Sequence, residues 1–370
     1  MKNRIYEYDC IRFLAIVSVV IGHSCYVSIG YTAYPPPVDT DPMYTNLFFT
    51  ILRLLSGFVY TFHMPLFFIL SGAVFALYVF KNGKKRNINL REIIYRKTKR
   101  LLLPYCLYGV LFMIPIKFMM NWYQPGSSLI TEIFQFLING KYPGHLWFLF
   151  SLFTIFVVVS LLVLYFKLNS THSIASMLLT GIALTWIFNN QALSFPHSFE
   201  IYNIFSKLYL ICFLLGLIFG YYLPLINSLT TQQKALRLSI FFFGIYLFSF
   251  VLLFKYPFKA ILGLYYATLI FLGLYFLFKY LCSYSYTKRL LNNRLSHFFF
   301  SNLMGIYLLH DPLNYVILYL SSSYHWLETS WGVCLFYFSR TIGLFILCAA
   351  LSQFISIALS KWKNLMTDKV

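Results

Sequence analysis

Charged residues are scarce in this chain of 370 residues, which has 29 Lys and Arg, only 10 Asp and Glu, and a charged fraction of 11%. Soluble domains carry about 25% charged residues. Hydrophobic residues make up 60% of the chain and aromatic residues 21%. A soluble globule of this size could not cover its surface with so few charges, and the composition is equally unlike collagen or a disordered chain. The composition therefore indicates a polytopic membrane protein.

Several motifs of soluble enzymes are also missing. The chain has no H-E-x-x-H segment, no C-x-x-C pair and no glycine-rich phosphate-binding motif. Its seven cysteines lie almost entirely inside apolar runs, where they are expected to act as small buried hydrophobes. With only ten acidic residues in the chain, a hydrolase that uses two catalytic carboxylates is not favoured. We therefore expect no metal site and no bound cofactor.

Long apolar runs dominate what is present. A membrane-spanning helix needs about 20 mostly apolar residues, and ten runs approach that length. They are 9–31, 53–80, 101–122, 146–166, 173–192, 204–223, 236–254, 259–281, 298–321 and 331–360. The fold class predicted is all-α, with about ten transmembrane helices in a single transmembrane domain over 1–370.

The basic residues predict the orientation of these helices. The connection 81–100 carries nine Lys and Arg but one acid, and the tail after 360 is also basic. Such clusters are typical of loops on the cytoplasmic side, so both termini are expected there. The net charge of +19 then fits an anionic leaflet rather than nucleic acid. The segment 121–144 is expected to be one of the longest external connections.

The first predicted span contains Asp9, Arg12 and His23. Arg12 and His23 are eleven residues apart, which on a helix places them within about 20° of each other and about 16 Å apart along the axis. Asp9 lies one turn before Arg12 and can pair with it. Ionisable groups inside a membrane are costly and are functional candidates by default. The alternative is a snorkelling Arg12 and a structurally satisfied His23.

Other spans place polar groups at a similar depth. By the rise of a helix, His23, His63, His310 and Arg340 lie roughly 12–17 Å below the outer surface, which predicts one buried polar site. The alternative is that each has a separate polar neighbour. Asp311 is the nearest carboxylate for Arg340, and pairing between them is favoured over contact of Arg340 with substrate. Pro65 is expected to kink the second span.

Five segments in order resemble the acyltransferase 3 family of integral membrane acyltransferases. The family pattern of Arg, ten residues and His matches Arg12 to His23. The second-span segment is HMPLFFILSG over 63–72, whose His-Met start resembles the branch that contains sugar O-acetyltransferases. The remaining three are KRLLLPY over 99–105, HLWFL over 145–149 and GIYLLH over 305–310. Asp311 departs from the small or apolar residue usual in the family.

The resemblance implies transfer of an acyl group, usually acetyl, from cytosolic acyl-CoA to a hydroxyl of a cell-surface glycan or lipid-linked sugar. It also implies a bacterial cytoplasmic membrane as the location. His23 would be the base or a transient acyl carrier. The catalytic residues implied are His23, Arg12, His63 and His310. The residues expected to bind substrate are Asp9, Ser71, Arg96, Arg100, His145, Trp147 and Arg340.

Two other functions fit parts of the pattern. An exporter or flippase of polysaccharide or lipid-linked sugar would also place ionisable groups near the middle of the membrane. Such carriers commonly show internal repeats, and the chain has no clear repeat. A purely structural membrane subunit would leave the histidines at one depth unexplained.

Overall fold

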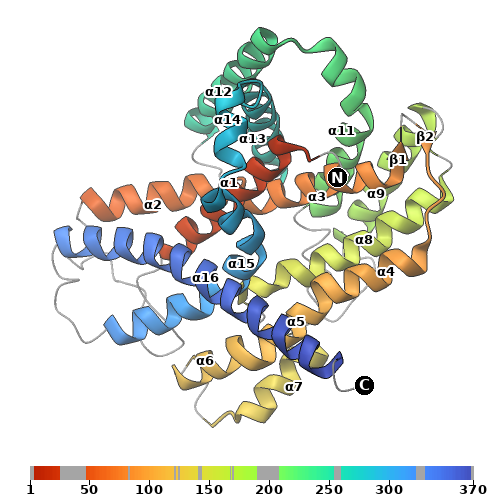
Figure 1. The fold of residues 1–370 in the computed structure, drawn as a ribbon. Helices are drawn as coiled ribbons and strands as arrows, with labels where there is room; N and C mark the ends of the chain where they lie inside the picture. Colours follow the sequence, from red (N-terminus) through yellow and green to blue (C-terminus); the bar gives the residue numbers. More distant parts are fainter. Residues whose placement is uncertain are drawn as a thin grey trace. The chain divides into compact units, whose positions relative to one another are not determined.

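A computed structural model describes most of the chain. The described residues are 4–25, 47–81, 84–120, 122–123, 126–140, 144–166, 168, 171–189, 208–253, 260–321 and 330–367. Nearly all of them are helical, and the strands among them form one short antiparallel hairpin, β1 (Phe80–Lys81) with β2 (Lys84–Lys85) (Figure 1). Eight of the described helical segments are long and apolar enough to cross a membrane. The prediction of an all-α polytopic membrane protein is confirmed.

The helices follow one another along the chain with short breaks. The helices up to residue 119 are α1 (Tyr6–Ser24), α2 (Leu47–Tyr60), α3 (His63–Val79), α4 (Leu90–Lys97), η1 (Thr98–Leu102), α5 (Leu103–Tyr108), η2 (Gly109–Met113) and α6 (Ile114–Met119). Those that follow are α7 (Leu129–Asn139), η3 (Gly144–Leu146), α8 (Trp147–Tyr165), α9 (Thr171–Asn189), α11 (Tyr209–Leu229), α12 (Gln232–Leu253), α13 (Ala260–Leu281), α14 (Ser285–Leu291), α15 (Arg294–Ser321) and α16 (Ser330–Thr367).

Helices occur at all ten predicted runs. The two without a full candidate span are α1, whose first turns carry Glu7, Asp9 and Arg12, and α9, whose apolar part is shorter. Residues 26–31, the end expected for the first span, lie outside the described residues. The predicted connection 121–144 contains the apolar helix α7, which the sequence analysis did not anticipate.

Prolines shape two of the predicted spans. The second span is interrupted at Thr61–Phe62, between α2 and α3, a few residues before Pro65, and the expected kink at Pro65 stays a prediction. In the third span the π-helical segments η1 and η2 each end shortly before a proline, Pro104 or Pro115. Proline has no N–H to donate to the preceding turn, and the wider helix accommodates that loss.

The described chain forms two compact units made of interleaved segments. The first unit comprises Met1–Ala15, Tyr60–Leu111 and Ile130–Lys288. The second comprises Ile16–Val59, Phe112–Leu129 and Arg289–Val370. In the first, α3 packs closely on α11 because glycines meet backbone: a Cβ at Gly216 would collide with the Ile69 carbonyl, and one at Gly72 with the Phe213 carbonyl. Small residues allow this close approach in membranes.

In the second unit the main helix pair is α15 with α16, and α6 also packs on α15. Gly305 on α15 lies directly against Ser352 of α16. Asn302 Nδ2 donates to Gln353 Oε1 at 2.9 Å across the same pair. Close packing and a polar contact together hold α15, which carries His310, in a defined position.

Candidate active site in the second unit

His23 lies in the last turn of α1, and its ring meets His310 of α15. The two ring centroids are 4.9 Å apart. Nε2 of His310 lies 3.0 Å from Nδ1 of His23, within hydrogen-bonding distance. Two histidines from opposite ends of the sequence, both expected to lie at one depth, therefore form a contact pair within the second unit.

Backbone contacts determine which nitrogen of His310 carries hydrogen. Nδ1 of His310 lies 3.1 Å from the carbonyl oxygen of Ile306 and 2.7 Å from that of Tyr307. Carbonyl oxygens only accept hydrogen bonds, so Nδ1 of His310 is the donor. In the neutral ring, Nε2 then holds a lone pair and faces His23 as an acceptor.

A carboxylate completes the arrangement. Oδ1 of Asp311 lies 3.2 Å from Nδ1 of His23, at ion-pair distance, and the same nitrogen is hydrogen-bonded to Nε2 of His310. Because Nε2 of His310 is the acceptor, Nδ1 of His23 carries the hydrogen, and the lone pair of the neutral ring lies on Nε2. A carboxylate beside the protonated nitrogen suits a histidine that becomes positively charged.

Side chains from α15 and α16 also hold the end of α1. The last carbonyls of a helix have no partner within the helix. Asn314 Nδ2 donates to the carbonyl of His23 at 3.0 Å, and the Arg340 guanidinium donates to the carbonyl of Ser24. A cation at the C-terminal end of a helix is favourable because that end carries partial negative charge. The backbone of His23 is thus fixed by two neighbouring helices.

Arg340 was expected to pair with Asp311 as part of the scaffold. The contacts found differ: the Asp311 carboxylate pairs with His23, and Arg340 bonds to the Ser24 backbone and lies over the ring of Phe336 at 4.7 Å. Arg340 is 3% exposed and Asp311 is 2% exposed. Arg340 therefore holds the C-terminal end of α1 by bonding to the main chain of Ser24.

The same cluster offers a ligand set for a metal ion. One ligand atom from each of His23, His310 and Asp311 lies within 4.8 Å of the others. The chemistry of the set suits zinc, which binds histidine and carboxylate. The hydrogen bonds already described use the same atoms, and His23 Nδ1 would have to lose its hydrogen to bind a metal. The expectation of no metal site stays a prediction.

A basic group lies in the first unit. Asp9 Oδ1 lies 3.7 Å from Arg12, which confirms the pairing expected from their spacing, and Asp9 also pairs with Arg4 at 2.7 Å. Arg12 is close enough to Arg100 for the two guanidinium groups to repel each other. Arg96 pairs with Glu92 on α4. Roles for Asp9, Arg12, Arg96 and Arg100 in catalysis or substrate binding stay predictions.

Other predicted site residues also belong to the first unit. The buried His63 at the start of α3 meets the ring of Tyr60 edge-on, with centroids 4.7 Å apart. His145 is buried in η3. Trp147 stacks on Tyr209 at 5.4 Å. Ser71 lies in α3 and is half-buried. Roles for these four residues in substrate binding or catalysis stay predictions.

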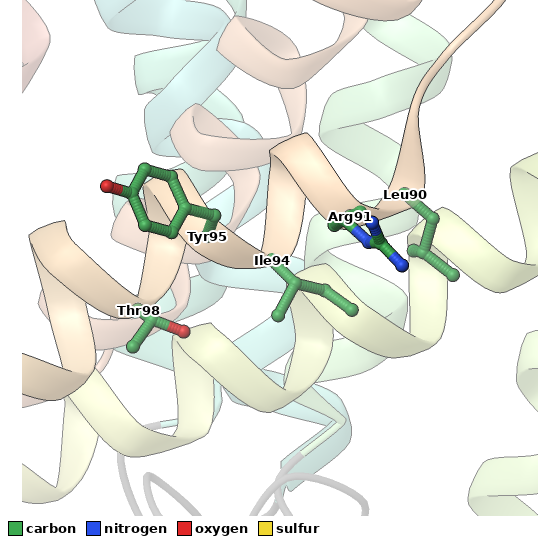
Figure 2. Close-up of a pocket in the computed structure, with 5 residues that line it drawn as sticks. All are labelled: Leu90, Arg91, Ile94, Tyr95 and Thr98. Carbon is green, nitrogen blue, oxygen red and sulfur yellow. The ribbon is translucent and has the colours of Figure 1, made fainter.

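A shallow pocket of 490 Å³ lies along α4 in the first unit. Its lining residues are Leu90, Arg91, Ile94, Tyr95 and Thr98. Figure 2 shows that all five project from one helical stretch. Lys99 Nζ lies over the Tyr95 ring at 4.5 Å, which adds a second cation beside the pocket. The polar groups of the lining are a guanidinium, a phenol and a hydroxyl.

Sequence analysis missed three polar residues of the second unit. Asp311 was named as a partner for Arg340 and as a departure from the family pattern but not as a partner of His23, and Asn314 was not singled out. Lys117, buried within the third span, was counted as part of an apolar run. Two signals were available: Asn314 follows His310 by four residues and so lies on the same face of α15, and Lys117 is an ionisable residue inside a span.

Comparison with known sequences and structures gives one match. A family described as an acyltransferase domain matches residues 5–358, nearly the whole chain. No curated protein matches the chain. No solved structure matches it either.

Proposed function

The chain belongs to this family of membrane acyltransferases, and from that membership we propose that it transfers an acyl group, usually acetyl, from acyl-CoA to a hydroxyl of a glycan or lipid-linked sugar. The observation that carries the proposal is the hydrogen bond from Nδ1 of His23 to Nε2 of His310, with the Asp311 carboxylate 3.2 Å from the same nitrogen. This arrangement leaves the lone pair of His23 on Nε2, where it can take a proton from an acceptor hydroxyl.

The reaction follows from that arrangement. His23 Nε2 removes the proton of the acceptor hydroxyl as its oxygen attacks the thioester carbonyl carbon. The resulting imidazolium is stabilised by the Asp311 carboxylate at 3.2 Å. When the tetrahedral intermediate collapses, the carbon–sulfur bond breaks and the sulfur of CoA takes the proton from Nε2. The products are the acyl ester and CoA thiol, and His23 returns to its starting tautomer.

His310 is a positioning residue in this scheme. Its Nδ1 is bound to the carbonyls of Ile306 and Tyr307, so its Nε2 can only accept from His23 while the ring is neutral. The ring therefore helps to hold Nδ1–H of His23 in place and does not itself need to exchange protons. Direct transfer to the acceptor is favoured over an acyl-histidine, because the buried carboxylate supports a base that becomes positively charged.

Recognition of the donor is proposed for the basic group of the first unit. CoA carries phosphate groups, and guanidinium groups bind phosphate with paired hydrogen bonds. Arg12 and Arg100 repel each other without a ligand, and a phosphate would relieve that repulsion. Arg12 and His23 lie on the single helix α1, separated along it by about 16 Å.

The experiment that tests the function uses protein purified in detergent. Wild type supplied with acetyl-CoA and a carbohydrate acceptor should release CoA thiol and yield an acetyl ester detectable by mass spectrometry. His23→Ala should insert and express normally yet lose at least about 100-fold in rate, the low end for loss of a general base. Wild-type activity in that variant would reject the proposed chemistry. Mass spectrometry of cell-surface glycans with and without the protein identifies the natural acceptor.

A further inference from the structure

Lys117 is a buried cation that the proposed chemistry does not use. It lies in α6, near the end of the candidate span Leu90–Met119, and is 3% exposed. Lysines near the ends of spans usually extend their ammonium group to the interface. A lysine this deeply covered has given up that hydration, and such a cost points to a function inside the protein.

Two aromatic rings surround the ammonium group. Nζ of Lys117 lies 4.7 Å from the ring centre of Trp122 and 5.4 Å from that of Tyr315. The two rings are 5.3 Å apart, and the Trp122 backbone N–H donates to the Lys117 carbonyl at 3.0 Å. Ring faces attract a cation, but they do not accept its hydrogen bonds as an oxyanion does. Within the described part of the chain, Lys117 Nζ has no hydrogen-bond acceptor and no ion-pair partner.

Lys117 and its two aromatic neighbours lie close to Asp311, which contacts the proposed base His23. Tyr315 follows Asp311 by four residues on α15, which is one helical turn, and Lys117 is near enough to Asp311 to attract it. The buried charged side chains among the described residues are Lys117, Arg340 and Asp311. These are two cations and one carboxylate, all in the second unit. One further negative charge, such as that of a bound ligand, would balance them.

We propose that Lys117, Trp122 and Tyr315 form a subsite for an acidic group on the acceptor, a carboxylate or a phosphate carried close to the hydroxyl that is acylated. The inference rests on the proposed function and names its substrate class. Lys117 binds the anion, and the half-buried ring of Trp122 offers an apolar surface to the sugar. An acceptor bound in this way presents its hydroxyl within about one helical turn of the Asp311–His23 pair.

Kinetics with three matched acceptors test the subsite. The probes are methyl β-glucuronide, methyl β-glucoside 6-phosphate and the neutral methyl β-glucoside. Wild type should prefer an acidic probe, and the better of the two identifies carboxylate or phosphate as the group recognised. Lys117→Gln should lower kcat/KM for that probe at least about tenfold, mainly through KM, and leave the neutral probe unchanged. Lys117→Arg should keep the preference.

Lys279→Gln is the matched control. Lys279 also lies in an apolar helix, and its Nζ donates to Asn227 Oδ1 at 2.8 Å in the first unit. This variant should leave the ratio of kcat/KM between the acidic and the neutral probes unchanged. Equal loss for all three probes in Lys117→Gln would overturn the subsite and make Lys117 a charge partner of Asp311. A wild-type preference for the neutral probe would overturn it as well.

A binding measurement that needs no catalytic turnover distinguishes the subsite from the proposed acyl transfer. The melting temperature of the purified protein is recorded with a glucuronic acid oligosaccharide, with a sugar phosphate and with a neutral glucose oligosaccharide. The subsite predicts stabilisation by an acidic ligand in wild type and its loss in Lys117→Gln. If that pattern appears while no acceptor supports CoA release, the proposed function fails and the subsite stands. Stabilisation by all ligands alike, or by none, would overturn the subsite.

Discussion

The Asp311 carboxylate lies 3.2 Å from Nδ1 of His23, although 288 positions separate the two residues in sequence. His310, the residue before Asp311, contacts the same nitrogen at 3.0 Å. Two consecutive residues of α15 therefore contact the same nitrogen, Nδ1 of His23 in α1. Because Nε2 of His310 accepts the hydrogen bond from Nδ1 of His23, the lone pair of the neutral His23 ring lies on Nε2, the atom proposed as the base. The carboxylate further favours the cation that forms when this base takes a proton.

Asp311→Asn should lower kcat about 10- to 100-fold. The amide has the same shape as the carboxylate, but it no longer carries the charge that stabilises the imidazolium, a loss of about 1.5–3 kcal/mol. The affinity for acyl-CoA should not change, since Asp311 lies in the second unit and the donor is assigned to Arg12 and Arg100. The measurement is CoA release under saturating substrates. An Asp311→Asn variant with full kcat would show that the pair is only structural.

The spatial relationships between residues of one helix could be predicted from the sequence. Arg12 and His23 are eleven residues apart in α1, and the expected pairing of Asp9 with Arg12 is present. Helices also occur at each predicted apolar run, because about 20 consecutive apolar residues have few alternatives in a membrane. A kink at Pro65 was predicted, and the structure shows an interruption at Thr61–Phe62, a few residues earlier.

Relationships between helices could not be predicted in the same way. Asp311 was expected beside Arg340 because both lie at one depth, but depth does not specify the direction in which a side chain points around its helix. The packing of α1 against α15 turns Asp311 toward His23. Lys117 shows a different difficulty, since one charge in an apolar run does not reveal which aromatic rings will cover it.

Arg12→Ala and Arg100→Ala should each weaken CoA binding about tenfold or more, because each removes a charge-assisted contact to phosphate. Arg12→Lys should recover part of the affinity if recognition is bidentate. Calorimetric titration of CoA into purified protein measures this directly. Arg289→Ala, which removes an exposed cation of α14, is the control and should bind normally. Unchanged CoA affinity in all three test variants would refute the donor assignment.

Gly216→Val should strongly destabilise the first unit. Any Cβ at Gly216 would collide with the Ile69 carbonyl, and backbone cannot move aside as a side chain can. Overpacking of this kind costs about 1–3 kcal/mol and sometimes more. Gly244→Val on α12 is the matched control, since a Cβ there meets nothing within 4 Å. Thermal melting in detergent compares them, and equal melting temperatures would contradict the close packing of α3 on α11.

Arg340→Ala should lower both thermal stability and kcat. The guanidinium holds the Ser24 carbonyl at the end of α1, and its loss leaves a buried carbonyl without its donor and the helix carrying His23 less firmly placed. Arg340→Lys should restore part of both properties, since an ammonium group can also donate there and still carries charge. The KM for acyl-CoA should stay the same. A variant that keeps full stability but loses activity would instead place Arg340 in contact with substrate.

Asn314→Ala provides the independent check on this role. Asn314 holds the His23 carbonyl, one residue before the carbonyl held by Arg340, so both side chains fix the same end of α1. Removing either should free that end, and removing both should add little to the loss of kcat. Groups that share one structural task are not additive in a double-mutant cycle. If the two losses in rate multiply instead, the side chains act separately, and Arg340 does not work through the position of His23.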